Sequence, residues 1–159
     1  MNGAQIKKII EKSLKKLVKQ DGDLIHRKVK EECINHKLAC YIEQFLNEEL
    51  DSHLNYEVDV EYNKNYYNPK KIIDENNNLK SIRPDIIVHK RNTNKHNLIA
   101  FEIKKDYSGR RDLEKIMGLQ RSPYNYDYGC LISYLPSKKY IKVKLLTKDN
   151  DKIEFKLQK

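Results

Sequence analysis

An aspartate, a glutamate and a lysine lie in two apolar segments near the middle of the chain. Asp85 opens the segment 85–89, and Glu102 and Lys104 lie within the segment 98–104. Because side chains alternate along a strand, Glu102 and Lys104 share one face of the second segment. Glu102 also interrupts an otherwise apolar run, where a solvated charge is not expected. These three residues are therefore candidates for chemistry.

The connection between the two segments decides how close these side chains come. Residues 90–97 are polar and Asn-rich, so an antiparallel hairpin is the simplest connection. With a turn centred near Asn94, Asp85 is expected opposite about Ile103 and beside Glu102. Two neighbouring carboxylates repel unless a cation lies between them, and such oxygen ligands suit Mg²⁺ or Mn²⁺. The backbone carbonyl of Ile103 is a further candidate ligand.

Lys104 has a chemical task in such an arrangement. Beside the carboxylates, its amine can orient a water molecule or take its proton. A divalent cation lowers the pKa of water and stabilises charge on a scissile phosphate, so the pattern predicts phosphodiester hydrolysis. The alternative is an ordinary cross-strand ion pair on the outer face of a hairpin, since 35% of the residues are charged.

Two helices are expected before these strands. Residues 4–19 place isoleucine, leucine and valine at helical spacing, with lysines between them. We expect this helix to end near residues 20–23. We also expect it to pack against the domain or against a second copy of the chain; the alternative is that it forms a basic arm that contacts phosphates. Residues 24–50 are expected to form the second helix, with Glu31 on the face of its apolar stripe. A buried Glu31 needs a partner; an exposed helix start, where negative charge suits the helix dipole, is the simpler interpretation.

The remaining segments predict six strands and a third helix. The strands are expected at about 56–62, 85–89, 98–104, 127–134, 139–147 and 152–157, and the helix at 112–121. Residues 63–81 are Asn- and Lys-rich and are expected to form a long loop. The order α-α-β-β-β-α-β-β-β predicts an α/β fold with a mixed central sheet flanked by helices. We expect residues 1–22 to be an N-terminal basic amphipathic helix and residues 23–159 a single α/β domain.

The composition restricts the partners and the location. The chain has 159 residues and a net charge of +9, from 32 Lys and Arg against 23 Asp and Glu. This charge favours a polyanionic partner, although a well-solvated surface explains it equally well. No apolar run approaches the ~18–20 residues of a membrane span, and no secretory signal is visible. Three cysteines without a CxxC pair fit a cytoplasmic location.

The order of these motifs resembles the PD-(D/E)xK nuclease superfamily, which has the restriction-endonuclease-like fold. The matching pieces are a helical Glu31, then Pro84-Asp85, then Glu102-Ile103-Lys104, followed by a helix and a strand. Over about residues 25–135 the sequence is also similar to a group of small uncharacterised bacterial proteins within that superfamily. The similar pieces are Leu38-Ala39 after Glu31, Glu61-Tyr62-Asn63, the run 83–91 and Tyr126-Asp127-Tyr128-Gly129.

This resemblance implies a role for each matched residue. Asp85 and Glu102 would bind the metal, Lys104 would position the water, and Glu31 would be an auxiliary acidic residue. Weaker candidates for the same site are Gln120, Glu61 and His89. For these three, a core glutamine, an exposed strand glutamate and a strand-end histidine are the simpler interpretations.

Basic residues near the candidate site fit binding to nucleic-acid phosphates without sequence readout. They are Lys70, Lys71, Arg91, Lys105, Arg110 and Arg111. Tyr66 and Tyr67 are candidates for stacking on bases. We therefore expect a metal-dependent, endonuclease-like hydrolase acting on DNA, with RNA left open. The alternative is a catalytically silent nuclease-fold module that binds DNA or a protein. A homodimer through the stripe of residues 4–19 is a further expectation.

Overall fold

The computed structural model describes residues 1–49, 55–149 and 151–159. The helices are α1 (Gly3–His26), α2 (Glu31–Glu49) and α3 (Arg110–Gln120). The strands are β1 (Glu57–Val60), β2 (Lys64–Asn65), β3 (Asn68–Pro69), β4 (Lys71–Ile73), β5 (Leu79–Ser81), β6 (Ile86–His89), β7 (Asn97–Lys104), β8 (Tyr128–Ser133), β9 (Tyr140–Thr147) and β10 (Lys152–Gln158). The expected order of main elements is present, with the short strands β2 to β5 inserted where a loop was expected.

One mixed sheet organises the fold. Its strand order is β1-β6-β7-β8-β9-β10, and all neighbours are antiparallel except β7 and β8, which are parallel. A parallel pair needs a crossover connection, and α3 supplies it. The mixed α/β sheet flanked by helices and the β6–β7 hairpin are therefore confirmed.

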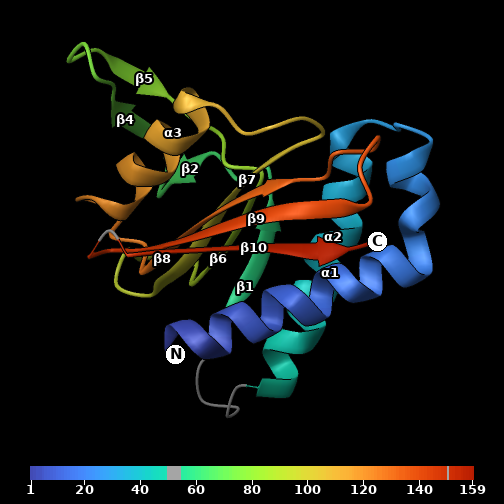
Figure 1. Cartoon of the computed structure of the whole chain (residues 1–159). Coiled ribbons are helices and arrows are strands. Elements are labelled where there is room, and N and C mark those ends of the chain that lie inside the picture. The colour runs from blue at the N-terminus through green and yellow to red at the C-terminus, as the bar shows by residue number, and fades with distance from the viewer. Residues whose placement is uncertain (50–54, 150) are drawn as a thin grey trace.

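The sheet separates two apolar cores. On one face α1 and α2 cover a core that includes Leu38 and Phe101, and on the other α3 packs over Ile87, Ala100 and Leu131. In Figure 1, α1 and α2 lie together on one side of the sheet, away from α3. Every residue of β7 except Lys104 is buried. A charged residue within β7 is consequently surrounded by protein.

The first helix is longer than the sequence predicts. It begins with a capping box between Asn2 and Gln5 and continues to His26 through a kink at Asp21. The expected end near residues 20–23 coincides with this kink, where Asp21 has non-helical backbone angles, and the expected boundary between residues 22 and 23 falls inside the second part of α1. The second helix begins at Glu31 rather than at residue 24, because the chain turns at Lys28 with φ 53°. Its expected end at residue 50 lies outside the described residues.

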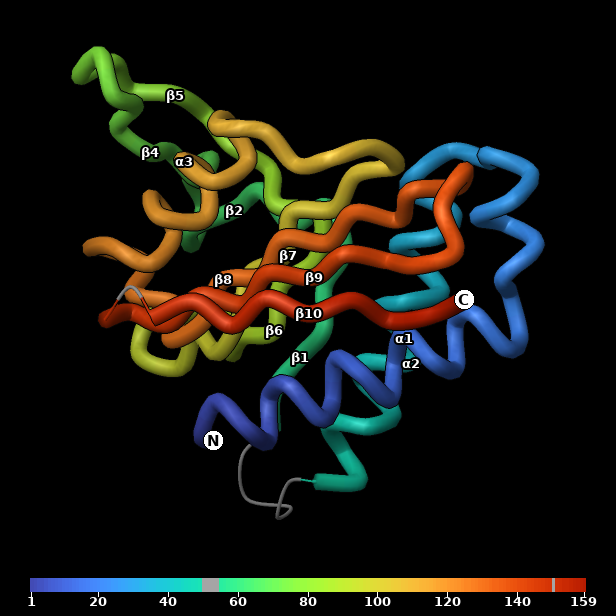
Figure 2. Tube along the Cα trace, viewed as in Figure 1, coloured from blue at the N-terminus to red at the C-terminus, as the bar shows by residue number. Residues whose placement is uncertain are grey.

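The apolar stripe of α1 packs within its own chain. Ile10, Leu14 and Leu17 are buried at 2%, 0% and 0% exposure, against α2 and the sheet. Figure 2 shows α1 running beside β10, and Lys7 lies over the Phe155 ring of that strand. The stripe is thus covered by the domain itself, as one of the two expected packings predicts, and the homodimer stays a prediction. No helix in the described part of the chain is long and apolar enough to cross a bilayer.

The segment expected to be a long loop forms two small hairpins, β2–β3 and β4–β5. The second projects from the body of the molecule in Figure 2. Asp74 holds its turn by accepting the N–H groups of Asn76 at 2.9 Å and Asn78 at 2.8 Å. Ile72 anchors it below α3, where its side chain would lie 2.7 Å from any Cβ added at Gly118. Gly118 therefore permits this close approach.

Leu14→Ala tests whether α1 belongs to the domain. Leu14 is fully buried, so removal of its side chain is expected to lower the free energy of unfolding by about 2–5 kcal/mol. Urea unfolding measures this change, and Lys15→Ala, at an exposed position of the same helix, serves as the control. The midpoint is expected to be independent of protein concentration. Equal stability of the two variants would contradict the packing.

Candidate functional site

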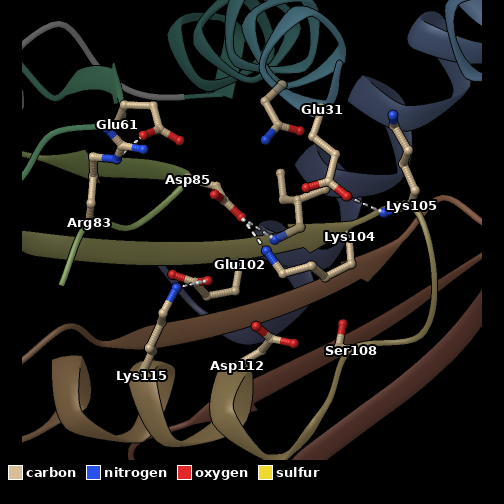
Figure 3. Close-up of polar contacts among 12 residues, drawn as sticks. Glu31, Glu61, Arg83, Asp85, Glu102, Lys104, Lys105, Ser108, Asp112 and Lys115 are labelled. Atoms are coloured by element: carbon tan, nitrogen blue, oxygen red, sulfur yellow. Dashed lines mark hydrogen bonds and ion pairs between the residues drawn. The ribbon is translucent and has the colours of Figure 1, made fainter. Parts of the chain in front are cut away.

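The β6–β7 pairing brings Asp85 and Glu102 together. Ile86 pairs with Phe101, so Asp85, one residue earlier, lies opposite Glu102 instead of Ile103. Its backbone N–H donates to the Phe101 carbonyl at 3.2 Å, and its Oδ2 accepts the Ile103 N–H at 2.6 Å. Burial raises the pKa of Asp85, while the Ile103 N–H and the lysines nearby oppose that rise. Figure 3 shows Asp85 and Lys104 pointing toward one another, with the Glu102 carboxylate beside them directed toward Lys115.

Glu102 is a charged side chain in the interior of the sheet. Its exposure is 0%. Its Oε2 accepts a hydrogen bond from the Lys115 Nζ at 2.8 Å, whereas its Oε1 is buried without a hydrogen-bond partner among the residues that the structure describes. Burial and, second, the charge of Asp85 raise the pKa of Glu102 from 4.5 to about 7, against the opposing effect of Lys115. A buried carboxylate oxygen without a partner is costly, so this atom is suited to a ligand.

Lys104 lies on the same face of β7 as Glu102, as the alternation predicts. Its Nζ is 3.9 Å from Asp85 Oδ2, and its side chain is 32% exposed. Burial lowers the pKa of Lys104, but the surrounding carboxylates, led by Asp85 and Glu102, outweigh burial and raise it overall. Lys104 therefore carries its charge at the point where the site opens to solvent.

A divalent cation fits this site in part. The two carboxylates provide oxygen ligands, and the partnerless Glu102 Oε1 is free to accept a cation. The N–H and carbonyl of one strand residue point to the same side. The Ile103 carbonyl therefore faces the Asp85 side, as its N–H does. In the described ranges no group of three or more His, Cys, Asp or Glu side chains is arranged to hold a metal, so the cation would depend on Asp85, Glu102, this carbonyl and water.

Glu31 lies at the end of β7, close to the same site. It is the first residue of α2, and its Oε1 accepts the backbone N–H of Lys105 at 2.8 Å. Lys105 Nζ in turn donates to the Lys28 carbonyl at 3.0 Å. Glu31 thus joins the start of α2 to the end of β7, and its negative charge contributes to the raised pKa of Lys104. Glu31 therefore lies at the start of a helix, as the simpler interpretation of this residue predicted.

The weaker candidates lie in three different places. Glu61 adjoins the site, because its N–H donates to the Asp85 carbonyl at 3.0 Å and its carboxylate pairs with Arg83. Gln120 does not reach the carboxylates; its amide donates to the Leu146 carbonyl at 3.3 Å. His89 lies at the opposite end of β6 from Asp85, with its Nε2 2.9 Å from Asp59 Oδ2.

The basic residues expected around the site are also dispersed. Lys70 is only 4% exposed, and its Nζ lies 4.7 Å from the centre of the Tyr62 ring. Burial lowers the pKa of Lys70 to about 8, so this residue is not a surface phosphate contact. Arg91 pairs with Asp59 and Arg110 with Glu75 and Glu114. Lys71 and Arg111 are exposed, and Lys105 is partly exposed.

Two residues of α3 belong to the site and were not predicted from the sequence. Lys115 bonds to Glu102. Asp112 accepts the Gly109 N–H at 2.8 Å, and its charge contributes to the raised pKa of Lys104. The available signal was helical spacing: Lys115 lies one turn before Leu119, which is buried on the sheet-facing side.

No protein-family model, curated protein sequence or solved structure gives a significant match to this chain. The arrangement of Asp85, Glu102 and Lys104 is therefore the basis on which a function is argued.

Glu102→Gln tests the buried carboxylate. Because burial raises the pKa of folded Glu102 to about 7 from 4.5, the folded protein binds this proton more tightly than the unfolded chain does. The free energy of unfolding therefore falls as pH rises from about 4.5 to about 7, and the loss persists above that window. A glutamine does not titrate, so the free energy of unfolding of Glu102→Gln does not fall in this way. At about 1.4 kcal/mol per pKa unit, the variant is therefore expected to gain on the order of 3 kcal/mol of stability relative to wild type between pH 4.5 and pH 7.

Urea unfolding in EDTA across this pH range measures the difference. Glu43→Gln, at an exposed position of α2, controls for loss of one carboxylate and is expected to track wild type. If the difference in free energy of unfolding between Glu102→Gln and wild type does not vary with pH, the pKa of Glu102 is not raised.

Proposed function

We propose that this protein is a metal-dependent phosphodiester hydrolase of the PD-(D/E)xK type that acts on DNA. The observation that carries the proposal is the placement of Glu102 beside Asp85 and Lys104, with the buried Glu102 Oε1 lacking a partner in the described part of the chain. An ordinary cross-strand ion pair is solvated and has no reason to bury a glutamate completely. The 0% exposure of Glu102 therefore favours the functional interpretation.

The order of elements supports the restriction-endonuclease-like fold. Helix α2 precedes β1, β6 and β7, which are joined antiparallel, and α3 then leads to β8, which is parallel to β7. The motifs fall in this order as the resemblance implies: Glu31 at the start of α2, Asp85 before β6, and Glu102 with Lys104 in β7.

Asp85, Glu102 and the Ile103 carbonyl are the groups that would hold Mg²⁺ or Mn²⁺. When bound, such a cation lowers the pKa of water and stabilises negative charge on a phosphate. Lys104 reaches the open side of the site and would orient the attacking water or hydrogen-bond to a phosphate oxygen. Lys115 neutralises Glu102 and so limits the cost of an ionised carboxylate in the interior.

Cleavage assays test this function. Wild type is expected to cut DNA when Mg²⁺ or Mn²⁺ is added, because the carboxylates need the cation to act on a phosphate. Glu102→Gln and Lys104→Ala are each expected to reduce the rate at least about 100-fold. The assay compares supercoiled, linear duplex and single-stranded DNA, with RNA of the same sequence as a separate arm.

Asp127 and Lys148 supply the matched controls. They form an ion pair of 2.8 Å between exposed side chains, so Asp127→Asn and Lys148→Ala remove the same functional groups outside the site. Cleavage that survives in Glu102→Gln and Lys104→Ala would belong to a contaminant or to another site, and the proposal would fail.

Metal binding can be measured without activity. At about pH 8, Mn²⁺ at 100 times its dissociation constant is expected to stabilise wild type by about 2.7 kcal/mol. In thermal unfolding, Mn²⁺ is expected to raise the melting temperature of wild type and of Asp127→Asn, but not that of Glu102→Gln. The absence of any shift in wild type, together with salt-dependent DNA binding, would favour the alternative of a catalytically silent module. The Lys115 contact on Glu102 is the observation that keeps this alternative open.

A further inference from the structure

A pocket lies beside the carboxylate site on the same face of the sheet. It has a volume of about 210 Å³. Loop residues 107–109 and the start of α3 form one wall, β8 forms the floor, and β9 and β10 form the other wall. Its lining residues are Tyr107, Ser108, Gly109, Arg110, Leu113, Leu131, Ser133, Lys142, Lys144 and Glu154.

The strand register makes this pocket continuous with the site. In the parallel β7–β8 pair, Glu102 lies beside Leu131 and Lys104 beside Ser133. Paired side chains of neighbouring strands share one face and are about 5 Å apart. A molecule bound at Lys104 therefore has to extend only from β7 to the neighbouring strand β8 to contact Ser133.

The lining offers three kinds of contact. Leu113 and Leu131 are apolar, and Tyr107, 57% exposed, presents an aromatic ring at the rim. Ser133 is 4% exposed, and its Oγ accepts the Ser108 N–H at 3.1 Å, so its hydroxyl is held in a fixed place. An apolar floor, an aromatic ring and hydroxyl groups are the contacts that a nucleobase and sugar use.

The charges of the pocket favour a phosphate beside that base. Lys142 and Lys144 lie 3.6 and 3.5 Å from the same carboxylate, that of Glu154. Arg110 is also at the edge, although it pairs with Glu75 and Glu114 outside the pocket. One glutamate facing two lysines leaves a positive excess at the wall, which attracts the nucleic-acid backbone.

We propose that this pocket receives the unpaired nucleotide next to the scissile phosphate, so that the substrate is single-stranded or locally unpaired nucleic acid. The inference rests on the proposed hydrolase function and deepens it. A base that is paired and stacked in a duplex has no face free to lie between the two walls of the pocket and must leave the stack first. The pocket thus selects for strands whose bases are already unpaired.

Anisotropy of fluorescein-labelled oligodeoxynucleotides, measured in EDTA, tests the pocket without cleavage. Wild type is expected to bind the single strand more tightly than its perfectly paired duplex. Tyr107→Ala is expected to weaken single-strand binding by about tenfold, the loss of one stacked base. Tyr107→Phe keeps the ring and loses only the hydroxyl contact to Tyr140, so it is expected to bind like wild type.

Leu79→Ala is the control, because Leu79 is 64% exposed and lies outside the pocket lining. Tyr67, a candidate for stacking that also lies outside the lining, is the rival position. Equal single-strand binding by Tyr107→Ala and wild type, a loss in Tyr67→Ala in its place, or tighter binding of the duplex would each overturn the inference. The proposed function fails separately: Glu102-dependent cleavage with no Tyr107 effect leaves the hydrolase and removes the pocket. A Tyr107 effect on binding without any cleavage leaves a nucleotide-binding pocket and removes the hydrolase.

Discussion

The burial of the Glu102 carboxylate is the constraint on which the rest of the site depends. Glu102 occupies the interior of a central strand with no exposed surface, opposite Asp85 in the register. Burial raises the pKa of both carboxyl groups, and the charge of Asp85 adds to the rise at Glu102. Two lysines pair with these carboxylates: Lys104, from the same strand as Glu102, lies near Asp85, and Lys115, from α3, contacts Glu102. The remaining Glu102 Oε1 has no partner within residues 1–49, 55–149 and 151–159, so the charges are balanced only in part.

The surrounding elements are arranged to hold these charges in place. Because β7 pairs on both edges and is covered on both faces, the backbone that carries Glu102 and Lys104 has little freedom to move. Glu31 ties the start of α2 to the end of that strand. The N–H of Glu61 fixes the Asp85 backbone from β1's side. Rigid support of this kind keeps functional groups at reacting distances, and it comes from elements far apart in the sequence.

Local patterns predicted the parts of this structure that depend on period and spacing. Alternation placed Glu102 and Lys104 on one face because strand period is fixed at two. The register was wrong by one residue, since the β6–β7 turn is centred slightly before Asn94. The predicted end of the first helix near residues 20–23 coincides with non-helical backbone angles at Asp21 (φ −128°, ψ 20°), but a further helical segment follows and buries Ile25.

The same local patterns did not predict which residues from distant parts of the sequence contact one another. Lys115 meets Glu102 only because of how α3 is rotated over the sheet, which no spacing in the sequence specifies. His89 follows Asp85 closely in sequence, yet an extended strand of four residues, Ile86–His89, carries it to the other end of β6, where it meets Asp59. Lys70 appears in the sequence as one more surface lysine, but Tyr62 and Tyr124 enclose it.

The two lysines at the carboxylates differ in a way that relates the site to its neighbouring pocket. Lys115 is bonded directly to Glu102 at 2.8 Å, whereas Lys104 stands 3.9 Å from Asp85, beyond an ordinary hydrogen bond. Lys104 therefore retains donors for another molecule, and its strand neighbour is Ser133 in the floor of the pocket. A phosphate held by Lys104 would have its attached nucleotide directed along β8 toward Tyr107 and the paired lysines of β9. The sheet itself would thus provide the path that joins such a phosphate to the pocket beside it.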